Sequence, residues 1–192
     1  MKKIFIILKI IVFGACISFV NIPQSIAQKD LWVVADSLTI RLAPSSFPSL
    51  PKNIAHYLEI NGYTIPQCYC DSTPHNVIHG YFAYFGQKDW AVLASKNRVS
   101  SIFVFWNGSE KYPVKFQTKT DRSYLQGIGN GKIGYSRVIS TVRKDFILQH
   151  YEWYGGTKPP QIDHQGINDA FIEKASEVHY YYDKWIILTG SD

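Results

Sequence analysis

The chain has 192 residues, of which 46% are hydrophobic and 15% aromatic, with 20 Lys and Arg against 15 Asp and Glu. Three of the basic residues lie among the first 27, which leaves 17 basic and 15 acidic residues in 28–192, a net charge of +2. Such a small excess lacks the clustered basic footprint of a nucleic-acid-binding domain, so we expect no nucleic-acid partner.

The N-terminus has the order of a secretory signal peptide. Lys2 and Lys3 precede an apolar run over residues 4–20, and the small-residue site at 25–27 predicts cleavage after Ala27. Because Lys9 leaves only residues 10–20 uninterrupted, well short of the roughly 20 that a bilayer span needs, we expect no integral membrane span after cleavage. The sequence thus predicts a secreted or periplasmic protein. The alternative is a lipoprotein cleaved before Cys16, although the apolar segment continues past that residue.

Residues 28–192 contain no linker or low-complexity tract and are predicted to form one domain. Residues 31–34 and 38–42 are expected to be short extended segments. A helix is predicted over 52–59, because Ile54, Ala55 and Leu58 recur at helical spacing, and Gly62 ends it. We expect this helix to lie at the edge of the following sheet.

The chain changes to a strand pattern from residue 77. Aromatic and β-branched runs predict strands over 77–84, 90–95 and 99–106, and the last of these, apolar on both faces, suits a central position. Further strands are predicted over 113–117, 138–142, 176–182 and 185–189, with a second helix over 143–154. Grouped strands with segregated helices predict an α+β fold, with an antiparallel sheet and about two helices.

Two resemblances add to this reading. His75–Phe82 and Gly86–Leu93 resemble one blade of the FG-GAP type, in which a glycine turn and an aspartate precede an apolar strand. That family's turn carries several acidic residues that bind calcium, whereas here Gln87 and Lys88 stand beside a single Asp89, so we predict no metal there. More broadly, segments 74–95, 124–129 and 163–192 are similar to those of a group of exported bacterial proteins of unknown function. That similarity implies export and a shared architecture, and it identifies no catalytic residue.

Cys68 and Cys70 are the only cysteines outside the predicted signal. In an extended segment their α-carbons would lie near the upper limit for bridging, so a disulfide here would be easily reduced. They could form a redox pair or half of a metal site, but no second pair completes a zinc cluster. We therefore expect two free or partly buried thiols.

Several motifs match catalytic or ligand-binding patterns only in part. Gly129–Gly134 fits G-x-G-x-x-G, but without a clear strand before it and a helix after it, a turn with Asn130–Gly131 at its tip is expected, and no dinucleotide cofactor. Ser136 lies in half of a nucleophile elbow, and a serine hydrolase would require His150 or His164 and Asp163 to join it.

Possible metal ligands are also present. His75 and His79 would lie about 13 Å apart in a strand, too far to share one ion. Residues 163–169 supply oxygen ligands around Gly166, yet without EF-hand spacing, so a solvated turn is predicted between Asp163 and Asp169. The neighbouring pairs Asp121–Arg122 and Glu173–Lys174 are expected to be surface ion pairs.

The aromatic residues exceed what a core of this size needs, and some are expected at the surface, where they could stack on a sugar or pack on a partner. These residues are Trp106, Tyr151, Trp153, Tyr154, Tyr180, Tyr181, Tyr182 and Trp185. The sequence thus favours a non-catalytic binding domain with a carbohydrate or protein ligand. The alternatives are an extracytoplasmic hydrolase with unknown catalytic residues and a structural component of the envelope.

Overall fold

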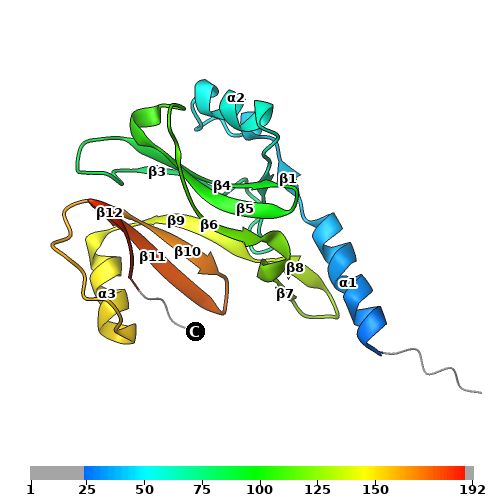
Figure 1. Cartoon of the computed structure of the whole chain (residues 1–192). Helices are drawn as coiled ribbons and strands as arrows, with labels where there is room; N and C mark the ends of the chain where they lie inside the picture. The colour runs from blue at the N-terminus through cyan, green and yellow to red at the C-terminus, as the bar shows by residue number, and fades with distance from the viewer. Residues whose placement is uncertain (1–23, 189–192) are drawn as a thin grey trace, which may run out of the picture.

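Two four-stranded antiparallel sheets carry most of the computed structural model, which describes residues 24–188 (Figure 1). The first sheet has the order β3-β4-β5-β6, and its strands are β3 (Val77–Gly80), β4 (Asp89–Lys96), β5 (Val99–Phe105) and β6 (Val114–Thr120). The second has the order β12-β11-β10-β9, with β9 (Arg137–Val142), β10 (Gly166–Phe171), β11 (Ala175–Tyr182) and β12 (Lys184–Leu188).

Shorter elements complete the domain. Two strand pairs are formed by β1 (Arg41–Leu42) with β2 (Ile65–Pro66), and by β7 (Leu125–Gly127) with β8 (Ile133–Tyr135). The α-helices are α1 (Gln24–Leu38), α2 (Lys52–Ile60) and α3 (Lys144–Tyr154), and the 3-10 turns are η1 (Pro44–Ser46), η2 (Trp106–Gly108) and η3 (Asp121–Tyr124). The predicted α+β class is confirmed, with the strands divided between separate sheets.

The first sheet lies between α2 and the second sheet (Figure 1). Its side chains alternate, so that one face packs against α2 and the other against the second sheet. On β5, Phe103 and Phe105 pack against α2, whereas Ile102 and Val104 face the second sheet. A strand with both faces buried has a continuous run of apolar residues in its sequence, as β5 does. The predicted central position is confirmed because β5 lies between β4 and β6.

Helices α2 and α3 cover the outer faces of the two sheets. Ile54, Ala55 and Leu58 of α2 are buried against the first sheet, so this helix covers a face and does not lie at the expected edge. Ile147 of α3 packs on Val178 in the second sheet. The layers therefore follow the order α2, first sheet, second sheet, α3, with an apolar core between each pair of neighbours.

Asn76 joins the edges of the two sheets. Its side-chain Nδ2 donates to the carbonyls of Pro66 at 2.7 Å and Arg137 at 3.2 Å, and its Oδ1 accepts the N–H of Ile139 at 3.0 Å. The residue is buried and has φ 72°, a conformation that asparagine tolerates better than most residues. One buried amide thus replaces a strand ladder between β3 and β9.

Several segments differ from their predicted conformation, among them residues 38–40, since Leu38 ends α1 and β1 begins only at Arg41. Residues 31–34 belong to α1 and are not extended, because Trp32 and Ala35 share a helical face that packs near Tyr124 and Tyr135. Residues 166–169 belong to β10, where a solvated turn was predicted, and Asp169 is buried. Only the beginning of that segment, at Asp163, is exposed.

Buried ion pairs explain why Asp169 can enter the core. Arg137, with no exposed surface, donates to both carboxylate oxygens of Asp169 at 2.9 and 2.7 Å. The predicted surface pairs are wrong in the same way, because Asp121 is buried and accepts from Arg41 at 2.9 Å, not from its neighbour. Within the described residues Glu173 and Lys174 form no ion pair, and the ammonium of Lys174 lies over the ring of Phe171.

The predicted signal lies mostly outside the described residues, including Cys16, and so does the last residue of the final predicted strand, 189. Residues 24–27, which contain the predicted cleavage site, form the start of α1. In the described part of the chain, no helix combines the length and apolarity needed to cross a membrane.

Candidate functional site

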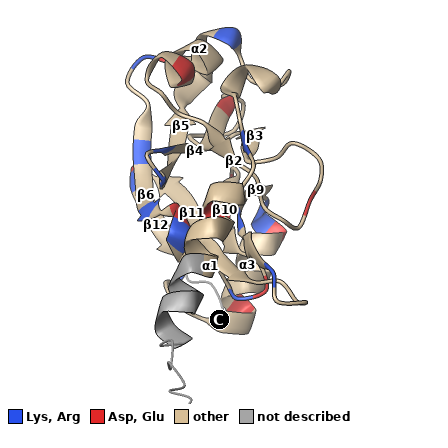
Figure 2. Ribbon diagram, turned by 90° about the vertical axis from the view of Figure 1, so that its right-hand side faces the viewer, with Lys and Arg blue, Asp and Glu red and all other residues tan. Residues whose placement is uncertain are grey.

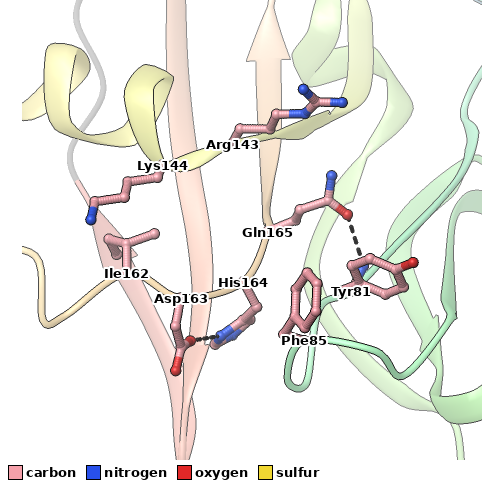
Figure 3. A pocket seen from close by; sticks show the side chains of 8 residues that line it. All are labelled: Tyr81, Phe85, Arg143, Lys144, Ile162, Asp163, His164 and Gln165. Atoms are coloured by element: carbon pink, nitrogen blue, oxygen red, sulfur yellow. Dashed lines mark hydrogen bonds and ion pairs between the residues drawn. The ribbon is translucent and has the colours of Figure 1, made fainter.

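A cavity of about 340 Å³ lies where the loop after β3 meets the start of α3 and the segment before β10 (Figure 3). It therefore joins elements that belong to the two different sheets. Its walls combine aromatic, charged and amide side chains from Tyr81, Phe85, Arg143, Lys144, Ile162, Asp163, His164 and Gln165. Such a mixture of apolar surface and a few polar groups is typical of small-ligand sites.

Asp89, at the start of β4, holds the loop that carries Tyr81 and Phe85. Its Oδ2 accepts the backbone N–H groups of Phe82 and Ala83, both at 3.0 Å. Its Oδ1 accepts from Gln87 Nε2 at 2.7 Å and from the N–H of Asn107 at 2.8 Å. Both oxygens of this buried carboxylate are thus used in fixing the loop.

Gln165 fastens the same loop to the other side of the cavity. The N–H of Tyr81 donates to Gln165 Oε1 at 2.9 Å, and the N–H of Gln165 donates to the carbonyl of Tyr81 at 2.9 Å. The contact requires glycine at position 80, because a Cβ there would lie 2.8 Å from Gln165 Oε1 and 2.8 Å from the ring of Phe82. The two walls are therefore held together before any ligand binds.

Asp163, His164 and Tyr180 form a hydrogen-bonded group at the base of the cavity (Figure 3 shows the first two). The Tyr180 hydroxyl lies 2.8 Å from His164 Nδ1 and 3.1 Å from Asp163 Oδ1, and the imidazole stacks on the Tyr180 ring with centroids 4.3 Å apart. The hydrogen bond from His164 lowers the pKa of Asp163, with a further contribution from Tyr180. Burial raises the pKa of Tyr180.

These contacts decide what the group can do chemically. His164 Nε2 lies 2.9 Å from the carbonyl of Tyr181 and must donate to it, while Nδ1 faces Asp163 and Tyr180. Both ring nitrogens are therefore hydrogen-bonded to groups of the protein itself. The Asp163 side chain is 68% exposed and is the carboxylate that a ligand can reach.

The opposite wall of the cavity is aromatic. The rings of Tyr81 and Phe85 meet edge to face with centroids 5.3 Å apart, and Phe85 is 75% exposed. Figure 3 shows the Phe85 ring beside His164, with Arg143 and Lys144 extending from the start of α3 in different directions. An apolar ring surface thus faces polar groups across the opening.

The residues of the predicted serine triad do not come together. Ser136 is fully buried, and its Oγ donates to the carbonyl of Gly134 at 3.3 Å. His150 Nε2 instead contacts Ser176 Oγ at 3.1 Å, and His164 pairs with Asp163. This placement contradicts a Ser136 hydrolase.

The other partial motifs have structural roles. Residues 128–132 join β7 to β8, with Asn130 at φ 50° and Gly131 at φ 70°, which confirms the predicted turn. His75 Nε2 accepts the N–H of Cys68 at 2.6 Å, whereas His79 is exposed and lies beside the Trp90 ring. Within residues 24–188, no group of three or more His, Cys, Asp or Glu side chains could hold a metal ion.

Cys68 and Cys70 form a disulfide, with α-carbons 5.3 Å apart. The expectation of two free thiols is therefore wrong. It failed because the chain turns at residues 69–70 and so brings the two α-carbons closer than an extended strand would.

The predicted surface aromatics divide into two sets. Trp106, Tyr181 and Trp185 pack together with Phe116 between the sheets, the two indole rings 5.9 Å apart and nearly parallel. Tyr180 is fully buried. The expected exposure holds for Trp153, Tyr182 and Tyr154, which are 65%, 54% and 49% exposed, whereas Tyr151 is half-buried.

Sequence reasoning missed most of the cavity lining. Tyr81 was assigned to a strand predicted over 77–84, although β3 ends at Gly80 and the cavity loop begins there. The glycine at position 86 and the strand-starting Asp89 were the available signals for a loop. Nothing in the local pattern indicated that Arg143 or Gln165 would meet this loop.

Lys and Arg are spread over several elements in Figure 2, including α2 and the β6 edge.

No protein-family model, no curated protein and no solved structure matches the chain.

Proposed function

We propose that this domain binds a carbohydrate outside the cytoplasm, in the cavity between Tyr81, Phe85 and Asp163. The observation that carries the proposal is the pairing of an exposed aromatic wall with an exposed carboxylate across an opening of about 340 Å³. A sugar ring has an apolar C–H face and a rim of hydroxyl groups, so it needs these two kinds of surface together.

Each wall has a specific part in such a complex. The exposed Phe85 ring offers a flat apolar face on which a pyranose ring can stack. The Asp163 carboxylate accepts hydrogen bonds from sugar hydroxyls, and the low pKa that His164 imposes keeps it ionised in mildly acidic surroundings. Ionised carboxylates make stronger hydrogen bonds than neutral acceptors do.

Arg143 and Lys144 favour an acidic sugar over a neutral one. Both are exposed, flank the cavity and begin α3, whose N-terminal end carries partial positive charge. A uronic acid carboxylate near them would gain hydrogen bonds from the Arg143 guanidinium. We therefore place uronic-acid oligosaccharides ahead of neutral ones as ligands.

Binding without hydrolysis is favoured by the carboxylates that line the cavity. Glycoside cleavage ordinarily uses two acidic residues facing the scissile bond, whereas Asp163 is the acidic side chain among the eight lining residues. His164 lines the cavity too, but both of its nitrogens are hydrogen-bonded to protein groups and none is left to contact a sugar. Export of the chain, predicted from residues 1–27, gives the domain access to envelope or extracellular polysaccharides.

The test is binding of the full chain to a panel of neutral and uronic-acid oligosaccharides, measured by calorimetry. We expect binding to a uronic-acid member, weakened about tenfold by Phe85→Ala and by Asp163→Asn. The matched control is Tyr112→Ala, which removes a ring that is 92% exposed and lies outside the cavity. Equal weakening by all three variants, or binding to no member of the panel, would overturn the proposal.

A further inference from the structure

The Cys68–Cys70 disulfide has two unequal sulfur atoms. Cys68 is 3% exposed and buried beside β2, whereas Cys70 is exposed in the turn that follows. An incoming thiolate can therefore reach the Cys70 sulfur more easily than the Cys68 sulfur. Neither cysteine lines the cavity described above.

This disulfide contributes little to the stability of the fold, because its two cysteines are so close in the sequence. A single residue separates the two cysteines, and a crosslink that closes so short a loop removes little entropy from the unfolded chain. Disulfides that stabilise a domain usually close longer loops. Exposed disulfides have higher reduction potentials than structural disulfides, and they exchange readily with thiols.

Hydrogen bonds prepare Cys68 to leave as a thiolate. The N–H of Cys70 donates to Cys68 Sγ at 3.2 Å, a contact that favours negative charge on that sulfur. The N–H of Cys68 donates to His75 Nε2 at 2.6 Å, and His75 Nδ1 lies 2.8 Å from the carbonyl of Thr73. The backbone around Cys68 is thus fixed, while the side chain of Cys70 faces solvent.

We propose that Cys68–Cys70 is a thiol–disulfide exchange site, separate from the carbohydrate site. A substrate thiolate attacks Cys70 Sγ, a bond forms between the two sulfurs, and the Cys68–Cys70 bond breaks with its electron pair on Cys68. A second substrate thiolate then attacks the mixed disulfide at the substrate sulfur and releases Cys70 as a thiolate. The substrate dithiol is oxidised to a disulfide and the Cys68–Cys70 disulfide is reduced to two thiols.

The thiols can belong to a small molecule such as glutathione or to a polypeptide. Cys68 lines an apolar hollow of about 180 Å³, together with Leu38, Ile40 and Tyr69. Leu38 is 74% and Ile40 64% exposed, so apolar side chains lie at the surface next to the disulfide. The small-molecule thiol and the polypeptide thiol react by the same sulfur chemistry. The variant Leu38→Glu, which changes this hollow, distinguishes the two in the test below.

The test uses the full chain with Cys16→Ser in every variant, so that only two sulfurs can react. The folded protein is equilibrated with mixtures of reduced and oxidised glutathione, the free thiols are alkylated, and the mass is measured. We expect Cys68 and Cys70 to pass from the disulfide to two thiols within these mixtures while circular dichroism stays unchanged. A disulfide that opens only when the protein unfolds, or thiols that never pair, would overturn the proposal.

Single-cysteine variants test the assigned order of attack. Cys68→Ser leaves the exposed Cys70, and it should form a mixed disulfide with oxidised glutathione about tenfold faster than Cys70→Ser does. Equal rates would contradict the roles given to the two sulfurs. The rate of mixed-disulfide formation by Cys68→Ser is then measured with oxidised glutathione and with a disulfide-containing peptide, each with and without the added substitution Leu38→Glu. Slower trapping of the peptide alone identifies a polypeptide substrate, and an unchanged rate identifies a small thiol.

Discussion

Gln165 and Tyr81 exchange two hydrogen bonds of 2.9 Å, one through the glutamine side chain and one between backbone groups. Tyr81 follows β3 of the first sheet, and Gln165 precedes β10 of the second, so the pair closes the cavity across the junction between the sheets. This contact fixes the distance between the aromatic wall and the Asp163 carboxylate. Preorganisation of this kind lowers the entropy lost when a ligand binds.

Gln165→Ala should therefore loosen the cavity. We expect the free energy of unfolding in urea to fall by about 1 kcal/mol, because the exposed N–H of Tyr81 loses its side-chain acceptor but can bind water. Amide hydrogen exchange at Tyr81 should accelerate. Gln161→Ala, an exposed glutamine earlier in the same segment, is the control and should change neither quantity. Unchanged exchange in Gln165→Ala would show that the two walls are held by other contacts.

Asp89→Asn should disorder the loop that carries Phe85. The amide presents an N–H₂ group to donors that now face a carboxylate oxygen, so we expect a loss of about 3 kcal/mol in the free energy of unfolding. The matched control is Asp71→Asn, since the exposed Asp71 accepts two hydrogen bonds from Thr73, one from its N–H and one from its hydroxyl. Equal losses in the two variants would contradict the role given to Asp89.

The buried Arg137–Asp169 pair predicts a double-mutant result. Arg137→Met leaves Asp169 buried without its partner and should cost about 3 to 5 kcal/mol in the free energy of unfolding, and Asp169→Leu should cost a similar amount. The double variant should be less destabilised than the sum, because no buried charge remains without a partner. Arg98, which is 47% exposed and pairs with Asp36, is the comparison, and Arg98→Met should cost about 1 kcal/mol or less. Additive losses at Arg137 and Asp169 would contradict direct coupling.

His179 predicts how stability depends on pH. Burial lowers its pKa from 6.5 to about 4, partly offset by the charge of Asp169, while Arg137 and Lys119 lower it further. Glu177 lies 3.8 Å away, and within residues 24–188 His179 Nε2 has no hydrogen-bond partner. The unfolded chain binds a proton at higher pH than the folded chain does. Stability from this residue is therefore complete above pH 6.5 and decreases as the pH falls toward 4.

Urea denaturation at pH 7, 5 and 4 measures this effect. The loss from His179 across the window should be about 3 kcal/mol, and His179→Leu should remove that part of the pH dependence. His56→Gln changes an exposed histidine and should leave the profile as it is in the natural chain. A His179→Leu profile as steep as the natural one would contradict the assignment.

Local sequence patterns predicted the elements whose side chains face an apolar core. The runs in β4 and β5 and the spacing of Ile54, Ala55 and Leu58 in α2 were sufficient, because burial alone determines these patterns. In β10 the same reasoning failed. An aspartate such as Asp169 is typical of loops, and it is buried in β10 only because it pairs with Arg137, 32 positions away in the sequence.

The candidate site was less predictable than the fold, for a related reason. Its walls come from three segments that are separated by long stretches of chain, and none of them carries a motif by itself. The aromatic content correctly suggested exposed rings, but it indicated the C-terminal hairpin more strongly than Phe85. Only the meeting of the two sheets brings Tyr81, Phe85 and Asp163 together.

The most direct test of the account locates the bound ligand. Isotope-labelled protein is titrated with the oligosaccharides of the panel, and the backbone amide resonances are followed. The account predicts that a uronic-acid oligosaccharide shifts the resonances of Tyr81, Phe85, Asp163 and Lys144 together, with one saturation curve. Shifts confined to the other exposed rings, at Trp153, Tyr154 or Tyr182, would contradict it, as would a titration that moves no resonance.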